Sequence, residues 1–203
     1  MNDDRSGEAI STSFPTVTLG LPAWVEELDL DREYPTQEER MRLVVELSRL
    51  NVERGTGGPF GAAVFDLSTN RLVAPGMNLV VPSNCSVAHA EMVAIMVAQQ
   101  VVGDFDLGGD GRPAYELLAS TEPCAMCFGA TPWSGVRRLV CGARDEDARA
   151  VGFDEGAKLS EWALALEERG IAVERDVLRE EAAAVLRHYG ESGGRIYNAR
   201  QGD

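Results

Sequence analysis

Two cysteines and one histidine give the strongest chemical signal in the sequence. Cys124 and Cys127 stand three residues apart in "PCAMC", a spacing that puts both side chains on one face of a helix. A helix N-terminus favours the thiolate form of cysteine, which is the form that binds metals. His89 in "CSVAHAEMVAI" adds an imidazole. Two thiolates and one imidazole form a three-ligand zinc set whose fourth position stays open for water.

A carboxylate accompanies this predicted metal set. Glu91 follows His89 by two residues, too close and too far round a helix for both to bind one ion easily. We expect Glu91 to face the open position and to move protons for a water whose pKa zinc lowers towards ~7. A single histidine is usually structural, and one C-x-x-C pair is often a redox site. Together, H-A-E followed by P-C-x-x-C match the signature of zinc nucleobase deaminases.

The segments around these residues are predicted to alternate between strands and helices. A helix is expected to begin after Thr36 and to stop at Gly55. Residues 56–82 read as two or three strands, with a hairpin turn at "STN" and a break at Gly76. "AHAEMVAIMVAQQVV" is apolar nearly all round, as in a helix buried inside a fold.

The second half of the chain continues this alternation. Strands are predicted at "AYELLAS", "VRRLVCGA" and "IAVERDV". Helices are predicted from near Pro123, at "SEWALALEERG" and at "REEAAAVLRHYGES", and "DEDARAVGFDEG" is predicted to be a short helix and a loop. Such alternation predicts a layered α/β domain with helices on both faces of one sheet. We expect this domain to cover residues 35–203, after an N-terminal arm, residues 1–34, with a short helical turn near "PAWVEELD".

The composition excludes several classes of protein. With 203 residues, 44% hydrophobic and 26% charged, the chain reads as a globular protein with a sizeable core. No apolar run reaches the ~20 residues of a membrane helix, and the N-terminus does not resemble a signal peptide, so we predict no membrane contact and a cytoplasmic location. A net charge of −14 argues against nucleic-acid binding. Four cysteines in a cytoplasmic chain favour metal binding or core packing over disulfides.

Six stretches resemble the guanine deaminase branch of the cytidine-deaminase-like superfamily. They are "GGPFGAAVF", "GMNLVVP", "AHAEMVAI", "STEPCAMCFGATPWSGV", "GFDEG" and "RIYNAR". The zinc motifs are common to the superfamily, whereas "GFDEG" and "IYNAR" point to guanine. The sequence looks particularly similar to a bacterial subgroup that also accepts ammeline. The resemblance implies a three-layer α/β/α fold with a mixed five-stranded sheet, one zinc ion per subunit and a homodimer.

The resemblance also implies which residues handle the metal and the protons. His89, Cys124 and Cys127 would bind zinc, and Glu91 would be the main proton shuttle. Glu155 in "GFDEG" resembles a second carboxylate that contacts substrate and helps to expel ammonia. Taken without the resemblance, Glu155 also fits an ordinary loop carboxylate.

Four further residues would bind the substrate by the same resemblance. Asn78 would hydrogen-bond the base, and Phe60 and Trp133 would pack against its ring. Tyr197 belongs to a C-terminal tail that closes an active site in relatives, often that of the neighbouring subunit. The residues alone also fit plainer roles: a turn residue for Asn78, core aromatics for Phe60 and Trp133, and a frayed end for Tyr197.

The predicted reaction is the hydrolytic deamination of a free nucleobase, with guanine giving xanthine and ammonia. Ammeline, cytosine or a nucleoside remain open as substrates. Deamination of adenosine in tRNA uses the same zinc motifs, but it needs phosphate-binding cations, and this acidic chain is short of them. A non-catalytic zinc-stabilised binding module is the alternative from a different class. Glu91 argues against it, because a structural zinc site needs no base beside an open position.

Overall fold

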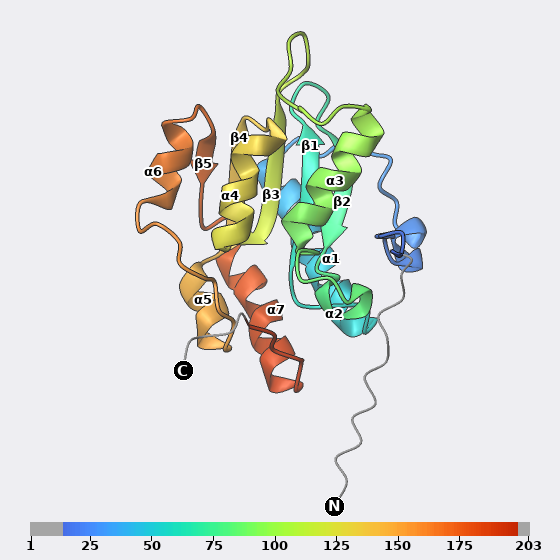
Figure 1. Ribbon diagram of the computed structural model, residues 1–203, viewed down its shortest axis with the longest axis vertical. Helices are drawn as coiled ribbons and strands as arrows, with labels where there is room; N and C mark the ends of the chain where they lie inside the picture. Colours follow the sequence, from blue (N-terminus) through green and yellow to red (C-terminus); the bar gives the residue numbers. More distant parts are fainter. Residues whose placement is uncertain (1–13, 199–203) are drawn as a thin grey trace, which may run out of the picture.

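The computed structural model describes residues 14–198, which form three layers with a β-sheet in the middle (Figure 1). The strands are β1 (Gly61–Asp66), β2 (Arg71–Met77), β3 (Tyr115–Thr121), β4 (Arg138–Ala143) and β5 (Ala172–Glu174). The α-helices are α1 (Gln37–Glu53), α2 (Val80–Ser83), α3 (Ala90–Val102), α4 (Ala125–Ser134), α5 (Asp145–Ala150), α6 (Trp162–Glu167) and α7 (Arg179–Glu191).

The sheet is mixed and has the strand order β2-β1-β3-β4-β5. Strand β1 runs antiparallel to both β2 and β3, whereas β3, β4 and β5 are parallel. The hairpin between β1 and β2 turns at the predicted "STN". The predicted three-layer α/β/α fold with a mixed five-stranded sheet is therefore confirmed.

Alternating side chains of the strands fill two separate cores. Ala62 and Val64 of β1 pack in one cluster with residues of α3 and α6, on the face where Figure 1 shows α3 and α4. Ala63 and Phe65 point to the opposite face and pack with Met41 of α1. Apolar residues on both faces of each strand are what a sheet covered by helices on both sides requires. The burial of these side chains stabilises the sheet, whose strand ends carry the residues of the site.

Helix α1 begins where the sequence predicts. The Thr36 hydroxyl accepts a hydrogen bond from the Glu39 backbone N–H at 3.2 Å, and the Glu39 carboxylate accepts one from the Thr36 N–H at 3.0 Å. This reciprocal capping box satisfies two of the unpaired N–H groups at the helix start. The helix then packs its apolar face under β1 and β3.

Gly76 does not end a strand, contrary to the prediction. Strand β2 passes through it and through Pro75, which is tolerated because β2 lies at the edge of the sheet. A Cβ atom at Gly76 would lie 2.4 Å from the Ala90 carbonyl oxygen and 2.5 Å from the Ala94 nitrogen. The glycine therefore serves the close approach of α3 to the sheet. A third strand does not follow, since residues 80–83 form α2.

The N-terminal arm joins the main core through a short 3-10 helix, η1 (Ala23–Glu27), which confirms the predicted helical turn. Trp24 and Val25 of η1 are buried and pack with Leu47 of α1 and Met77 of β2. Residues 1–13 of the predicted arm lie outside the described residues, and the domain boundary at residue 34 stays a prediction. Across residues 14–198, every helix is too short or too polar to cross a membrane.

Candidate active site

The carboxyl end of β3 gathers residues that are far apart in the sequence. Because β1 is antiparallel to β2 and β3, the start of β1 and the ends of β2 and β3 meet at one edge of the sheet. Phe60 directly precedes β1, Asn78 directly follows β2, and Cys124 stands three residues after β3. The sheet thus places these three residues around one point.

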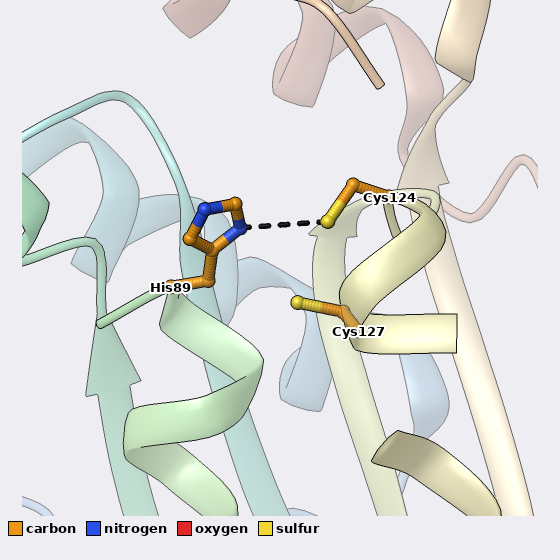
Figure 2. Close-up of side chains that lie close together, drawn as sticks. All are labelled: His89, Cys124 and Cys127. Atoms are coloured by element: carbon orange, nitrogen blue, oxygen red, sulfur yellow. Dashed lines mark hydrogen bonds between the residues drawn. The ribbon is translucent and has the colours of Figure 1, made fainter. Parts of the chain in front are cut away.

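The predicted metal ligands lie together at this edge (Figure 2). The ligand atoms of His89, Cys124 and Cys127 are all within 4.8 Å of one another. Nδ1 of His89 is 3.5 Å from Sγ of Cys124. A tetrahedral zinc ion with ordinary Zn–N and Zn–S bonds sets its nitrogen and sulfur ligands about 3.6 Å apart. Both the donor types and their spacing therefore fit zinc.

Two helix N-termini point at the metal group. His89 is the N-cap residue of α3 and Cys124 is the N-cap residue of α4, both with extended backbone. Neither the His89 nor the Cys124 side chain makes a capping hydrogen bond to its own helix. Both side chains can therefore point towards each other. The positive ends of the two helix dipoles stabilise negative charge here, which favours thiolate ligands.

The two thiols shift each other's pKa in opposite directions. The hydrogen bond with Cys127 lowers the pKa of Cys124 to about 4, and the same bond raises the pKa of Cys127. A lowered pKa favours the thiolate, which is the form that binds metals. Binding of a metal ion by both sulfurs would displace their protons, so the affinity for the metal rises with pH.

Two buried carboxyl groups face the same place. Glu91, in the first turn of α3, is 8% exposed, and burial raises its pKa. Glu155, in the loop between α5 and α6, is 5% exposed, and burial raises its pKa to about 8, helped by the negative charge of Cys124. A carboxyl group with a raised pKa can both take and give a proton near neutral pH.

A small, partly open cavity lies between these groups. It has a volume of about 30 Å³, which gives room for water rather than for a heteroaromatic ring. Its lining includes seven of the nine predicted site residues, namely Phe60, Asn78, His89, Glu91, Cys124, Glu155 and Tyr197. The eighth, Cys127, belongs to the metal group beneath it.

Trp133 is the predicted site residue that the fold leaves apart. It is 85% exposed and lies in the last turn of α4, whose first turn carries the cysteines. It lies nine positions beyond Cys124, about 13 Å along the helix axis. Within residues 14–198, the predicted contact between Trp133 and the site finds no support.

Three residues of the cavity wall, Glu122, Phe153 and Asp154, were not predicted from the sequence. The Phe153 ring packs edge-on against the rings of Phe60, with centroids 4.9 Å apart, and of Tyr197, at 5.7 Å. Phe153 and Asp154 lie inside "GFDEG" and Glu122 directly precedes "PC", so their neighbours in the motifs were the available signal. Phe153 thus adds a second aromatic ring to the cavity wall beside Phe60.

The C-terminal tail closes the cavity of its own chain. The Asn78 side-chain amide donates a hydrogen bond to the Tyr197 hydroxyl at 2.5 Å. The side chain of Asn198 bonds the backbone of the loop below, donating to the Gly152 carbonyl at 3.0 Å and accepting from the Asp154 N–H at 2.9 Å. These contacts fix Tyr197 over the metal group, and a substrate can enter only if the tail moves.

A chain of hydrogen bonds connects the N-terminal arm to the backbone of Asn78. The Trp24 indole donates to the Thr56 hydroxyl at 3.0 Å, and that hydroxyl donates to the Asn51 carboxamide oxygen at 2.8 Å. The Asn51 amide in turn donates to the carbonyl oxygens of Gly58 and Asn78, both at 2.9 Å. The arm therefore helps to fix a cavity residue.

Comparison with known proteins agrees with this geometry. A family model described as "Cytidine and deoxycytidylate deaminase zinc-binding region" matches residues 35–143, more than half of the chain. The chain belongs to this deaminase family. The predicted family, zinc cofactor and enzyme class are thereby confirmed. In zinc deaminases of this kind, a glutamate that is not a zinc ligand acts as the general acid–base.

Several members of the deaminase family are similar over most of their length. Guanine deaminase of Bacillus subtilis (strain 168) is 35% identical over 143 residues, which cover 70% of this chain and 87% of that protein. A structure of guanine deaminase from Nitrosomonas europaea has a TM-score of 0.82 and 45% identity, covering 91% of this chain and 100% of that one. A structure of NE0047 in complex with 2,6-diaminopurine has a TM-score of 0.84 and 48% identity, covering 90% and 97%.

Proposed function

We propose that the protein converts guanine to xanthine and ammonia. The observation that carries this proposal is the enclosure of His89, Cys124, Glu91 and Asn78 in one cavity under the C-terminal tail. The metal group and a carboxylate supply the hydrolysis, and the carboxamide with two aromatic walls suits a flat polar ring. Similarity to two guanine deaminases over most of the chain supports guanine as that ring.

In this proposal His89, Cys124 and Cys127 hold the zinc ion. Bound zinc lowers the pKa of a coordinated water towards ~7, which makes that water a nucleophile near neutral pH. Cys127 is fully buried, so the ion would be held at the floor of the cavity, beneath the substrate.

Glu91 moves the protons. Its carboxylate takes a proton from the attacking water and delivers it to the ring nitrogen beside C2 of guanine. An oxygen–carbon bond forms at C2. A second proton, from the hydroxyl group now on C2, then passes through Glu91, with Glu155 beside it, to the amino nitrogen. The bond from C2 to that nitrogen breaks, the C2 oxygen becomes a carbonyl, and ammonia leaves. Burial, which raises the pKa of both carboxyl groups, prepares them to give protons back at neutral pH.

Asn78, Phe60 and Tyr197 bind the base. The Asn78 amide, now bonded to the Tyr197 hydroxyl, would turn to the polar edge of guanine when the tail opens and recloses. Phe60 would cover one face of the ring, together with Phe153. If the tail recloses over a bound base, a ribose on that base would collide with it, which favours a free base over a nucleoside.

The decisive experiment measures ammonia release from a panel of guanine, ammeline, cytosine, adenine and cytidine. We expect the highest kcat/KM for guanine. Glu91→Gln should keep one zinc per chain by metal analysis and lose about 10²–10⁴-fold in kcat. Glu180→Gln, which changes an exposed carboxylate far from the cavity, should leave kcat unchanged. A preference for another ring, or wild-type turnover by Glu91→Gln, would refute the proposal.

A mobility-shift assay with tRNA separates guanine from tRNA adenosine as substrate. The net charge of −14 predicts no shift at physiological salt. A salt-sensitive shift together with inosine formation would favour tRNA. If no base in the panel releases ammonia while zinc stays bound, the non-catalytic binding module is the better description. We also propose that the protein is a homodimer and that it is located in the cytoplasm.

A further inference from the structure

Lys158 is the only lysine in the 203-residue sequence, and it is buried. Its side chain is 6% exposed and lies in the loop between α5 and α6. The ammonium group donates a hydrogen bond to the Pro123 carbonyl at 2.8 Å and another to the Asp145 carboxylate at 3.2 Å. A carboxylate oxygen of Glu122 lies 4.0 Å away. A charge this deep inside a protein needs such partners to offset the loss of water.

The contacts of Lys158 join two parts of the proposed active site. Pro123 directly precedes the metal ligand Cys124, and Lys158 follows Glu155 by three residues. A second link runs parallel to the first, since the Ala125 N–H donates to the Glu155 carbonyl at 2.9 Å. The loop that carries Glu155 is therefore fastened to the metal-binding turn at two points.

The shape of the group explains why a lysine stands here. An ammonium is a compact charge with three donors, and it can reach a backbone carbonyl and a carboxylate in different directions. The planar guanidinium of arginine, the cation used everywhere else along this chain apart from two histidines, is larger and presents its donors in one plane. The Trp162 ring, with its centroid 5.0 Å from the ammonium nitrogen, covers the remaining side.

We propose that Lys158 is a positioning residue that holds the loop carrying Glu155 against the turn carrying Cys124, so that the Glu155 carboxyl group stays over the metal group. This inference rests on the proposed function, because it gives Glu155 a role in turnover. Lys158 itself does not line the cavity, and its hydrogen bond to the Pro123 carbonyl is its link to the metal-binding turn.

The first test removes the ammonium group and keeps the length of the side chain. Lys158→Met should retain one zinc per chain and lower kcat for guanine at least tenfold, by a larger factor than any rise in KM. The double variant with Glu155→Gln should have the kcat of Glu155→Gln alone, within twofold, because Lys158 acts through Glu155. Arg187→Met, which removes an exposed cation paired with Glu180, is the matched control and should leave kcat unchanged.

The inference is overturned if Lys158→Met loses less than tenfold in kcat or if it loses zinc. It is also overturned if the loss in kcat of the double variant equals the product of the losses of Lys158→Met and Glu155→Gln.

The second test needs neither a variant nor turnover. Because the chain has a single lysine, protein grown with ¹³C-labelled lysine shows one set of lysine side-chain signals in an NMR spectrum. With zinc bound, the terminal methylene signal should be displaced from its free-lysine position by the Trp162 ring. A signal at the free-lysine position would overturn the inference. Since this result is independent of activity, an inactive protein would count against the proposed function and not against the placement of Lys158.

Discussion

Single residues set the distances within the site, and Gly76 shows this most directly. It touches no substrate, yet it lets α3 lie against β2, and α3 carries Glu91 and begins directly after His89. A protein interior is close-packed, so even one added methyl group must displace something. At Gly76 the neighbouring atoms are backbone atoms of Ala90 and Ala94, which cannot move without the helix.

Gly76→Ala should therefore push α3 outwards. We expect a loss of about 1–3 kcal/mol in the free energy of unfolding, the usual cost of overpacking, together with weaker zinc binding. Urea denaturation and a zinc-competition titration measure the two effects. Gly129→Ala is the control, because Gly129 is an exposed residue of α4 with nothing within 4 Å of an added Cβ. That change should stabilise the protein by about 0.5–1 kcal/mol, since alanine favours a helix; a loss at both sites would contradict the explanation.

Asn198 controls the tail at the same scale. Its side chain makes the two hydrogen bonds that dock the tail on residues 152–154. Each such bond contributes about 0.5–1.5 kcal/mol, so Asn198→Ala should raise KM for guanine by about tenfold while zinc content stays the same. Initial rates over a range of guanine concentrations give KM directly. As a control, Glu191→Ala, at the exposed end of α7, should leave KM unchanged. An unchanged KM in Asn198→Ala would show that these two hydrogen bonds are not needed to dock the tail.

At the scale of elements, a buried ion pair joins α1 to the middle of the sheet. Glu116 of β3 is fully buried and pairs with Arg40 of α1, while Arg138 of β4 approaches from the other side at 3.6 Å. Arg40 also donates to the Tyr34 carbonyl at 2.8 Å, which ties in the residues that lead into α1. One carboxylate therefore links three elements of the fold.

Glu116→Gln removes the negative charge and leaves the buried Arg40 without its counter-charge. Loss of one partner of a buried pair typically costs 3–5 kcal/mol, so we expect a decrease of about 3 kcal/mol in the free energy of unfolding. Chemical denaturation followed by circular dichroism measures it. The exposed pair of Arg187 and Glu180 gives the comparison, where Glu180→Gln should cost less than about 1 kcal/mol. Equal losses at the two sites would mean that the buried pair has no special importance.

At the scale of the whole molecule, the metal ion and the fold should stabilise each other. His89 and Cys124 start two different helices, so one bound ion joins α3 to α4. A ligand that binds only the folded state stabilises that state by mass action. Removing zinc with a chelator should therefore lower the melting temperature and abolish turnover, and adding zinc back should restore both. Recovery of turnover without any change in melting temperature would indicate that the ion does not hold the two helices together.

The predicted homodimer is also tested at this scale. The described chain closes its own cavity with its own tail, so exchange of tails between subunits is not required for closure. We still expect two chains to associate, and sedimentation velocity should give about twice the chain mass of 21.9 kDa. A single species at the mass of one chain would refute the dimer and leave the cavity intact.

The sequence by itself determined the chemistry and the order of the elements. His89, Glu91, Cys124 and Cys127 could be recognised because metal ligands need particular side chains at short spacings, and those spacings survive as local helix geometry. The helix start at Thr36 and the turn at "STN" were predictable for the same reason, since a few neighbouring residues decide them.

Only the tertiary structure decided which distant segments meet. Strand pairing brings Phe60 and Asn78 to the end of β3, and no local pattern records that pairing. Phe153 lines the cavity because the 152–154 loop packs its ring against Phe60 and Tyr197, residues far away in the sequence. The roles of Gly76 and Lys158 were hidden for the same physical reason: each depends on contacts with atoms many residues away, and side-chain type alone does not reveal them.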